Sequence, residues 1–247
     1  MMFKVMTFNI QHALDYQKQA IDFDLFINAI KKYNADVCGL NEVRGEGPEE
    51  DYTDQTSTIA DGLGFNSYFG EAIKVKGTSP YGNAIVSRYP FKSVETIKIP
   101  DPENKKPNHR FESRCVIKAI ADIDGKEVCF LVCHMGLNLS EQKNAVETIC
   151  DLLNEIDIPV ILMGDFNTTP HNKILKPIRK VMKDTDDFNP VKNHGTYPSD
   201  KPNEKIDYIF YRDLKCLKAE TIEEILKPYL QEKADPFQQA LTLRCRL

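Results

Sequence analysis

The sequence of 247 residues contains no tryptophan, no histidine after residue 194 and no apolar run that approaches eighteen residues. A membrane-spanning helix needs about 20 mainly apolar residues, so no membrane span is expected. The absence of tryptophan leaves less for stacking on nucleic-acid bases, although ten tyrosines remain, and this slightly favours smaller phosphoesters over the substrates of a DNA-repair nuclease. The first residues turn polar at Thr7, before a secretory apolar core forms, and we expect a cytoplasmic protein.

Seven cysteines are present, and none belongs to a Cys-x-x-Cys pair of the kind that binds zinc or carries out redox chemistry. The nearest approach is Cys129 and Cys133, whose spacing places both thiols on one face of a strand. The cysteines lie mostly within apolar runs. Reduced, buried thiols are therefore expected.

The charge balance is acidic, with 32 Lys and Arg against 37 Asp and Glu, or −5 overall. This net charge argues against a sequence-independent grip on long nucleic acid. The charges are unevenly distributed, since 88–118 holds eight basic and four acidic residues, whereas 42–54 holds six acids and one arginine. A basic wall facing an acidic one would suit a metal-bound phosphate, although a solvated surface is the simpler explanation for most of these residues.

The apolar run Val160–Met163 is typical of a strand buried on both faces, and Gly164 is expected to end it. Asp165 and Asn167 follow, and on an extended backbone their side chains point the same way. Taken alone, this pair is better explained as a turn after a strand. The rest of the chain favours a site.

The remaining pattern predicts hairpins with a few helices. Asp124-Gly125 is a hairpin turn, Gly64 stops a helix, and Ser140 is the expected cap of another. Further strands are predicted at 3–10, 35–40, 81–89, 94–99, 114–122, 126–133, 206–210 and 240–247, and helices at 22–33, 55–63, 140–156 and 173–181. No linker or repeat interrupts the chain. We therefore predict one α+β domain over 1–247, with sheets packed face to face and helices outside.

Polar residues stand at the ends of separate predicted strands, and they make sense together if the strands converge on one rim: Asn9, Glu42, His134, Asp165, Asn167 and Asp207. Carboxylates and amides without clustered His or Cys form a hard oxygen site, which suits Mg²⁺ or Mn²⁺ better than zinc. Glu42 alone would suffice as the main anchor, because Mg²⁺ keeps several waters. His134 and Asn167 would donate to phosphate oxygens, and Asp165 would orient or deprotonate a water.

Six segments resemble, in order, the motifs of the endonuclease/exonuclease/phosphatase superfamily, the DNase I-like proteins: Thr7-Phe8-Asn9-Ile10, Leu40-Asn41-Glu42-Val43, Gly82 to Pro90, Cys133-His134-Met135-Gly136, Gly164-Asp165-Phe166-Asn167 and Lys205 to Phe210. The resemblance runs from residue 3 to about residue 211. Each motif alone is weak, but six in the right order are a strong signal.

The resemblance implies a four-layered α/β sandwich and metal-dependent cleavage of phosphoester bonds. It implies that Glu42 binds Mg²⁺ with Asn9 nearby, and that His134 contacts the phosphate in the transition state. By the same resemblance, Asp165 and Asn167 serve the water and the phosphate. Other positions expected near the phosphate are Arg114, Tyr81 and Asn83.

The chain departs from the family at its end. Members usually finish with a Ser-Asp-His motif whose Asp lies near the metal and whose His pairs with the counterpart of Asp207. Here Asp235 matches the motif's Asp, while Pro236, Phe237 or Gln238 takes the place of the His, depending on the alignment. Loss of a general acid or base commonly costs about 10²–10⁴-fold in rate.

Two hypotheses follow. The first is a Mg²⁺-dependent phosphodiesterase, phosphatase or nuclease, slowed by the missing histidine, acting on a small phosphodiester, a phosphorylated metabolite or a short nucleic acid. The alternative is a catalytically silent module that binds a phosphorylated ligand through the same rim. No protein partner is implied by the sequence.

Overall fold

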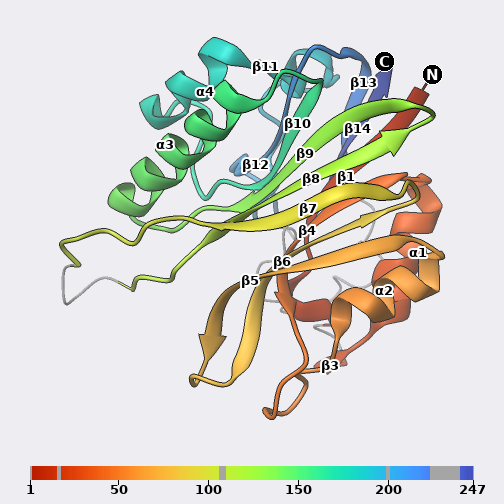
Figure 1. Cartoon of the computed structure of the whole chain (residues 1–247), viewed down its shortest axis with the longest axis vertical. Helices are drawn as coiled ribbons and strands as arrows, with labels where there is room; N and C mark the ends of the chain where they lie inside the picture. Colours follow the sequence, from red (N-terminus) through yellow and green to blue (C-terminus); the bar gives the residue numbers. More distant parts are fainter. Residues whose placement is uncertain (1, 16–17, 106–109, 199–200, 223–239, 247) are drawn as a thin grey trace.

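Figure 1 shows the computed structural model of the chain, which describes residues 2–15, 18–105, 110–198, 201–222 and 240–246. Two sheets pack face to face, and helices cover the outer face of each (Figure 1). Each sheet contains one parallel pair, and its other pairs are antiparallel. The predicted fold class, a four-layered α/β sandwich, is confirmed. No helix in the described part of the chain is long and apolar enough to span a membrane.

The first sheet has the order β13-β14-β1-β4-β6-β5 within the described residues. Its strands are β1 Met2–Asn9, β4 Val37–Arg44, β5 Asn66–Val75, β6 Ser79–Ser87, β13 Lys215–Ile222 and β14 Ala240–Arg246. The sequence pattern did not predict β5 and β13. Both lie at the edges of the sheet, where polar side chains dilute the apolar alternation.

The second sheet has the order β11-β12-β10-β9-β8-β7 within the same residues. Its strands are β7 Phe91–Lys98, β8 Cys115–Ile123, β9 Lys126–His134, β10 Val160–Asp165, β11 Lys183–Asp184 and β12 Asp207–Arg212. The hairpin at Asp124-Gly125 is confirmed. The expectation that Gly164 ends β10 was wrong. Gly164 lies inside the strand with φ of 144°, where a Cβ would fall 1.8 Å from the Cys133 carbonyl oxygen.

Four helices cover the sheets in the described structure: α1 Phe23–Tyr33, α2 Gln55–Leu63, α3 Leu139–Glu155 and α4 Lys176–Val181. Gly64 ends α2 in the left-handed conformation, as predicted. Ser140 was the wrong cap for α3. The helix begins one residue earlier, because Asn138 and Glu141 form a capping box.

Shorter elements connect these layers: β2 Leu14–Asp15, β3 Ala20–Ile21, η1 Gln11–Ala13, η2 Lys173–Leu175 and η3 Thr185–Phe188. The core lies between the sheets and beneath both helical layers. Cys129 and Cys133 are buried and reduced in the same cluster, on one face of β9 as expected.

Candidate active site

Polar residues from both sheets converge at one end of the sandwich. In the first sheet, Asn9, Asn41 and Asn83 lie opposite one another on β1, β4 and β6. In the second, His134 and Asp207 lie opposite Asp165 from either side. Residues paired across neighbouring strands project from the same face, so each sheet presents a polar row.

A cleft of about 600 Å³ opens at this end. Most of the predicted site residues line it: Asn9, Glu42, Tyr81, Arg114, His134, Asp165 and Asn167. Asn83 and Asp207 lie behind the lining and are buried. Asp235, Pro236, Phe237 and Gln238 lie outside the described residues.

Asn41 ties the two sheets together beneath the cleft. Its Nδ2 donates to Asn83 Oδ1 at 2.8 Å and to the Cys133 carbonyl at 3.0 Å. Its Oδ1 accepts the backbone N–H of Asp165 at 3.0 Å. Asn83 in turn donates to the Cys115 carbonyl at 3.2 Å. Asn83 was predicted as a substrate contact, and the structure places its amide within this buried bridge. The bridge also anchors the backbone of Asp165 at the cleft.

Glu42 leaves the strand ladder at a β-bulge. The register of β4 and β6 shifts between Asn41 and Val43, and Glu42 has φ of 59°. A bulge redirects a side chain that a regular strand would point elsewhere. Here it turns the carboxylate into the cleft, where Asn9 Nδ2 donates to Oε1 at 2.8 Å.

Tyr81 contacts the same carboxylate. Burial, the charges of Glu42 and Glu112, and a hydrogen bond to Glu42 raise the pKa of the Tyr81 hydroxyl well above its ordinary range. The hydroxyl therefore stays protonated and donates to Glu42. Tyr81 lines the cleft, so the predicted substrate contact stays a prediction, and its hydroxyl also holds Glu42.

Arg114 fixes the tautomer of His134. One guanidinium nitrogen lies 3.1 Å from His134 Nδ1. Because arginine only donates, Nδ1 must be the acceptor and the proton of the neutral ring sits on Nε2. Nε2 lies 3.3 Å from Asp165 Oδ2. The same guanidinium nitrogen, Nη1, also lies 2.9 Å from Glu112 Oε1.

Asn167 does not lie on an extended backbone, contrary to the expectation. Its φ is 46°, a left-handed conformation that asparagine tolerates. Its backbone N–H donates to Asp165 Oδ1 at 2.8 Å, and its Nδ2 donates to the Met135 carbonyl at 2.8 Å. The amide also lies 3.1 Å from His134 Nε2, so the two side chains still face the same cleft.

Asp207 is fully buried beside Asp165. Burial and the Asp165 charge raise its pKa well above the usual range, against the opposing effects of the Thr196 hydroxyl and Lys205. Among the described residues, no donor forms a hydrogen bond of good geometry to either carboxyl oxygen of Asp207. The Thr196 hydroxyl nevertheless lies close, since it accepts the Asp207 backbone N–H at 3.2 Å. The family's partner for this carboxyl is a histidine, and the chain has none after residue 194.

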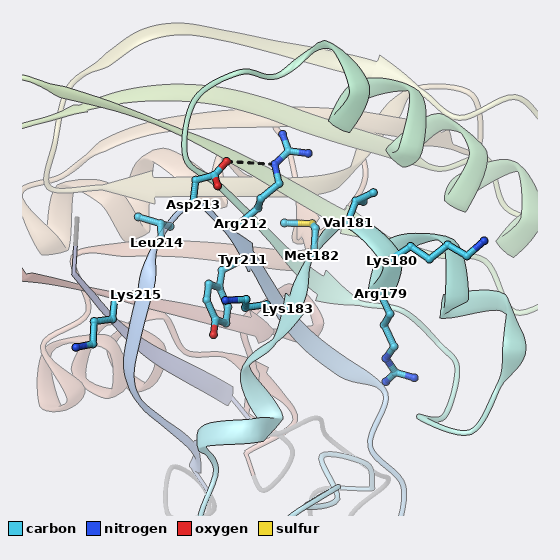
Figure 2. A pocket seen from close by; sticks show the side chains of 10 residues that line it. All are labelled: Arg179, Lys180, Val181, Met182, Lys183, Tyr211, Arg212, Asp213, Leu214 and Lys215. Atoms are coloured by element: carbon cyan, nitrogen blue, oxygen red, sulfur yellow. Dashed lines mark ion pairs between the residues drawn. The ribbon is translucent and has the colours of Figure 1, made fainter.

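The cleft also contains residues that the sequence pattern did not single out, among them Gln11, Arg110, Leu137 and Tyr197. Gln11 begins the short helix η1 and the other three lie outside helices and strands, so no periodic pattern in the sequence marks any of them. A second cavity of about 660 Å³ lies where α4, β11 and the β12–β13 turn meet (Figure 2). It contains none of the predicted site residues. Arg212, which lines this cavity, donates hydrogen bonds to the carbonyl oxygens of Leu153 and Ile156.

Oxygen donors for a metal are few. The described residues contain no group of three or more His, Cys, Asp or Glu side chains that would hold an ion. Glu42 supplies one carboxylate at the cleft surface, beside the amide of Asn9. This donor set fits a hydrated Mg²⁺ held by one or two carboxylates and phosphate oxygens, and it does not fit a closed zinc site.

The sequence profile of the Endonuclease/Exonuclease/phosphatase family matches residues 6–224. This chain belongs to that family. The resemblance of the six motifs to this family is therefore confirmed. Membership of the family supports a hydrolase that acts on phosphoesters. A comparison with curated proteins finds no match.

Solved structures of the endonuclease/exonuclease/phosphatase family share the fold. A family protein from Beutenbergia cavernae matches with a TM-score of 0.78 at 22% identity, over 100% of this chain and 72% of that one. The mannosyl-6-phosphatase of Bacteroides thetaiotaomicron matches with a TM-score of 0.76 at 13% identity, over 99% and 100%. A 2′,3′-cyclic phosphatase, in complex with adenosine-2′,3′-vanadate, matches with a TM-score of 0.71 at 17% identity, over 100% and 96%.

Proposed function

We propose that this protein is a Mg²⁺-dependent hydrolase of phosphoester bonds, acting as a single domain over 1–247. Its substrate is a small phosphodiester, a phosphorylated metabolite or a short nucleic acid. The observation that carries the proposal is the set of donors on Arg114, His134 and Asn167, which share one cleft with the carboxylates of Glu42 and Asp165.

Glu42 and Asn9 would hold the metal, with Mn²⁺ as a substitute for Mg²⁺. Asp235 matches a family position near the metal and is a further candidate ligand. When bound, the ion supplies positive charge that stabilises the developing negative charge on the phosphoryl oxygens. The hydrogen bonds from Asn9 and Tyr81 hold the Glu42 carboxylate in its orientation towards the cleft.

Asp165 is the proposed general base. It accepts a proton from the attacking water as the water oxygen bonds to phosphorus, while the ester P–O bond breaks and the leaving oxygen departs with its electron pair to take a proton from solvent. The backbone N–H of Asn167 holds one oxygen of this carboxylate, and Asn41 anchors its main chain.

His134, Asn167 and Arg114 are the proposed donors to the phosphate. Arginine presents its N–H groups in a rigid fork that suits phosphate, and Arg114 Nε is buried without a partner among the described residues. Because Arg114 donates to Nδ1, the proton of a neutral His134 ring lies on Nε2, and this nitrogen is the donor that faces the cleft. Donors held in place before the reaction are the usual source of transition-state stabilisation.

A second candidate is a silent phosphate-binding module. Its support is the absence of any histidine after residue 194, which leaves the buried Asp207 without the imidazole that the family pairs with it. Under this reading, the same donors bind a phosphorylated ligand and turnover is absent.

The test is turnover with Mg²⁺, Mn²⁺ and EDTA on an activated phosphodiester, an inositol phosphate, short RNA and short DNA. We expect metal-dependent release from at least one. Glu42→Gln should raise the Mg²⁺ concentration for half-maximal rate, whereas the exposed neighbour Glu46→Gln should leave it unchanged. If the protein binds phosphate but turns over none of these substrates, the enzyme hypothesis is wrong and the binding-module hypothesis replaces it.

A further inference from the structure

Leu137 is an exposed apolar residue at the lip of the cleft. It is 64% exposed and belongs to the cleft lining, three residues beyond His134. Single exposed leucines are ordinary on protein surfaces. Leu139 is such a case, because it is 55% exposed and lies outside the lining. The two leucines therefore separate the effect of cleft position from that of exposure.

The loop that presents Leu137 is held on both sides. Before it, the Met135 N–H donates to the Asp165 carbonyl at 2.9 Å. After it, the Asn138 N–H donates to Glu141 Oε2 at 3.1 Å. These bonds fix the backbone on either side of Leu137, whose side chain lies in the lining of the cleft.

Arg110 forms the other side of this lip. Asn138 Nδ2 donates to the Arg110 carbonyl at 2.7 Å, which brings the two segments together next to Leu137. The Arg110 side chain is 83% exposed and lines the cleft, with one guanidinium nitrogen 3.3 Å from Glu112 Oε2. The face of a guanidinium group stacks on aromatic rings, and a leucine side chain packs against them.

We propose that Leu137 and Arg110 form a subsite for a flat aromatic ring on the organic part of the substrate, next to the phosphate donors. The subsite rests on the proposed function and narrows it to phosphoesters that carry an aryl or nucleobase ring close to the phosphate. Leu137 supplies the apolar surface and Arg110 the stacking face.

The test compares inert phosphonates that do not turn over. Calorimetry with Mg²⁺ gives the Kd of methylphosphonate, benzylphosphonate and cyclohexylmethylphosphonate. We expect wild type to bind benzylphosphonate about tenfold more tightly than methylphosphonate, the gain from burying a few tens of Å² of apolar surface. Leu137→Asn should reduce this preference to about threefold or less and leave the Kd of methylphosphonate unchanged. Leu139→Asn should leave both values as in wild type.

Arg110→Met keeps an apolar stem and removes the guanidinium. In wild type, only the flat benzyl ring stacks on the guanidinium, so benzylphosphonate should bind more tightly than cyclohexylmethylphosphonate. Arg110→Met should abolish this preference. The proposal is overturned if Leu137→Asn keeps the full benzyl preference, or if Leu139→Asn lowers it equally. Failure of all three phosphonates to bind would instead refute the phosphate site of the proposed function, and equal binding of all three would refute the ring subsite alone.

Discussion

Asn41 offers a sharp test of how the two sheets position the cleft, through the substitution Asn41→Leu. Leucine keeps the branched shape of asparagine and removes its hydrogen bonds, while the greater bulk of its two methyl groups adds to the cost in this buried site. Three buried groups lose their contact with Asn41: the Asp165 N–H, the Cys133 carbonyl and Asn83 Oδ1. Each buried polar group left unpaired costs about 1–3 kcal/mol. Such costs are not additive within one network, so we expect a total loss of about 3–5 kcal/mol.

Urea denaturation measures this loss as a change in the free energy of unfolding. Asn66→Leu is the matched control, because Asn66 is exposed on the edge strand β5 and makes one long side-chain bond, 3.3 Å to the Ser87 carbonyl. The control should stay within about 0.5 kcal/mol of wild type. A loss below about 1 kcal/mol in Asn41→Leu would refute the view that this amide joins the sheets.

Further predictions concern buried charges. Asp207→Asn should stabilise the protein at pH 7, because burial and the Asp165 charge make ionisation of this carboxyl unfavourable and the amide does not ionise. The raised pKa of Asp207 means that the contribution of this one carboxyl to stability is fully present below its unfolded value of 3.8 and is lost as pH rises through the folded pKa, so the difference in urea stability between variant and wild type should grow with pH. Burial and Arg44 lower the pKa of His12 from 6.5 to about 4, and wild type should lose stability as pH falls through that interval. His12→Asn tolerates the φ of 50° and should lose less over the same interval, as thermal melts would record. Lys205→Met should cost about 3–5 kcal/mol in urea denaturation, because it leaves the Asp186 carboxylate, now 3.0 Å from the ammonium, without its buried partner. A neutral result for any one of these changes would contradict the burial or pairing assigned to that residue.

Local signals in the sequence predicted much of the fold. Gly64 and Asp124-Gly125 gave the end of α2 and the β8–β9 turn, since both depend on backbone conformations that few residues adopt. The edge strand β5 escaped prediction because its pattern contains glycine and charged residues and its pairing with β6 is set by the sheet. The sequence predicted Ser140 as the cap of α3 because Ser140 lies next to the same apolar run, whereas Asn138 caps the helix.

The residue types that line the candidate site were predicted from the sequence, but the backbone geometry that positions them was not. Glu42 and Asn167 both have positive φ, which no spacing argument reveals, since it assumes a regular strand. The contacts of Asn41 with β6, β9 and β10 bring together residues far apart in the sequence, so no local pattern reveals them. Leu137 carried no signal, because its loop has no period.

The most direct measurement is hydrolysis of bis(4-nitrophenyl) phosphate with Mg²⁺ by wild type, Asp165→Asn and the exposed turn variant Asp124→Asn. Asp124 has φ of 49°, which asparagine accepts, so this control keeps the fold and removes one surface charge. We expect EDTA to abolish turnover, Asp165→Asn to lower kcat by about 10²–10⁴-fold and Asp124→Asn to match wild type. Metal-dependent turnover that is equally fast in Asp165→Asn would contradict the assignment of Asp165 as the base in this cleft.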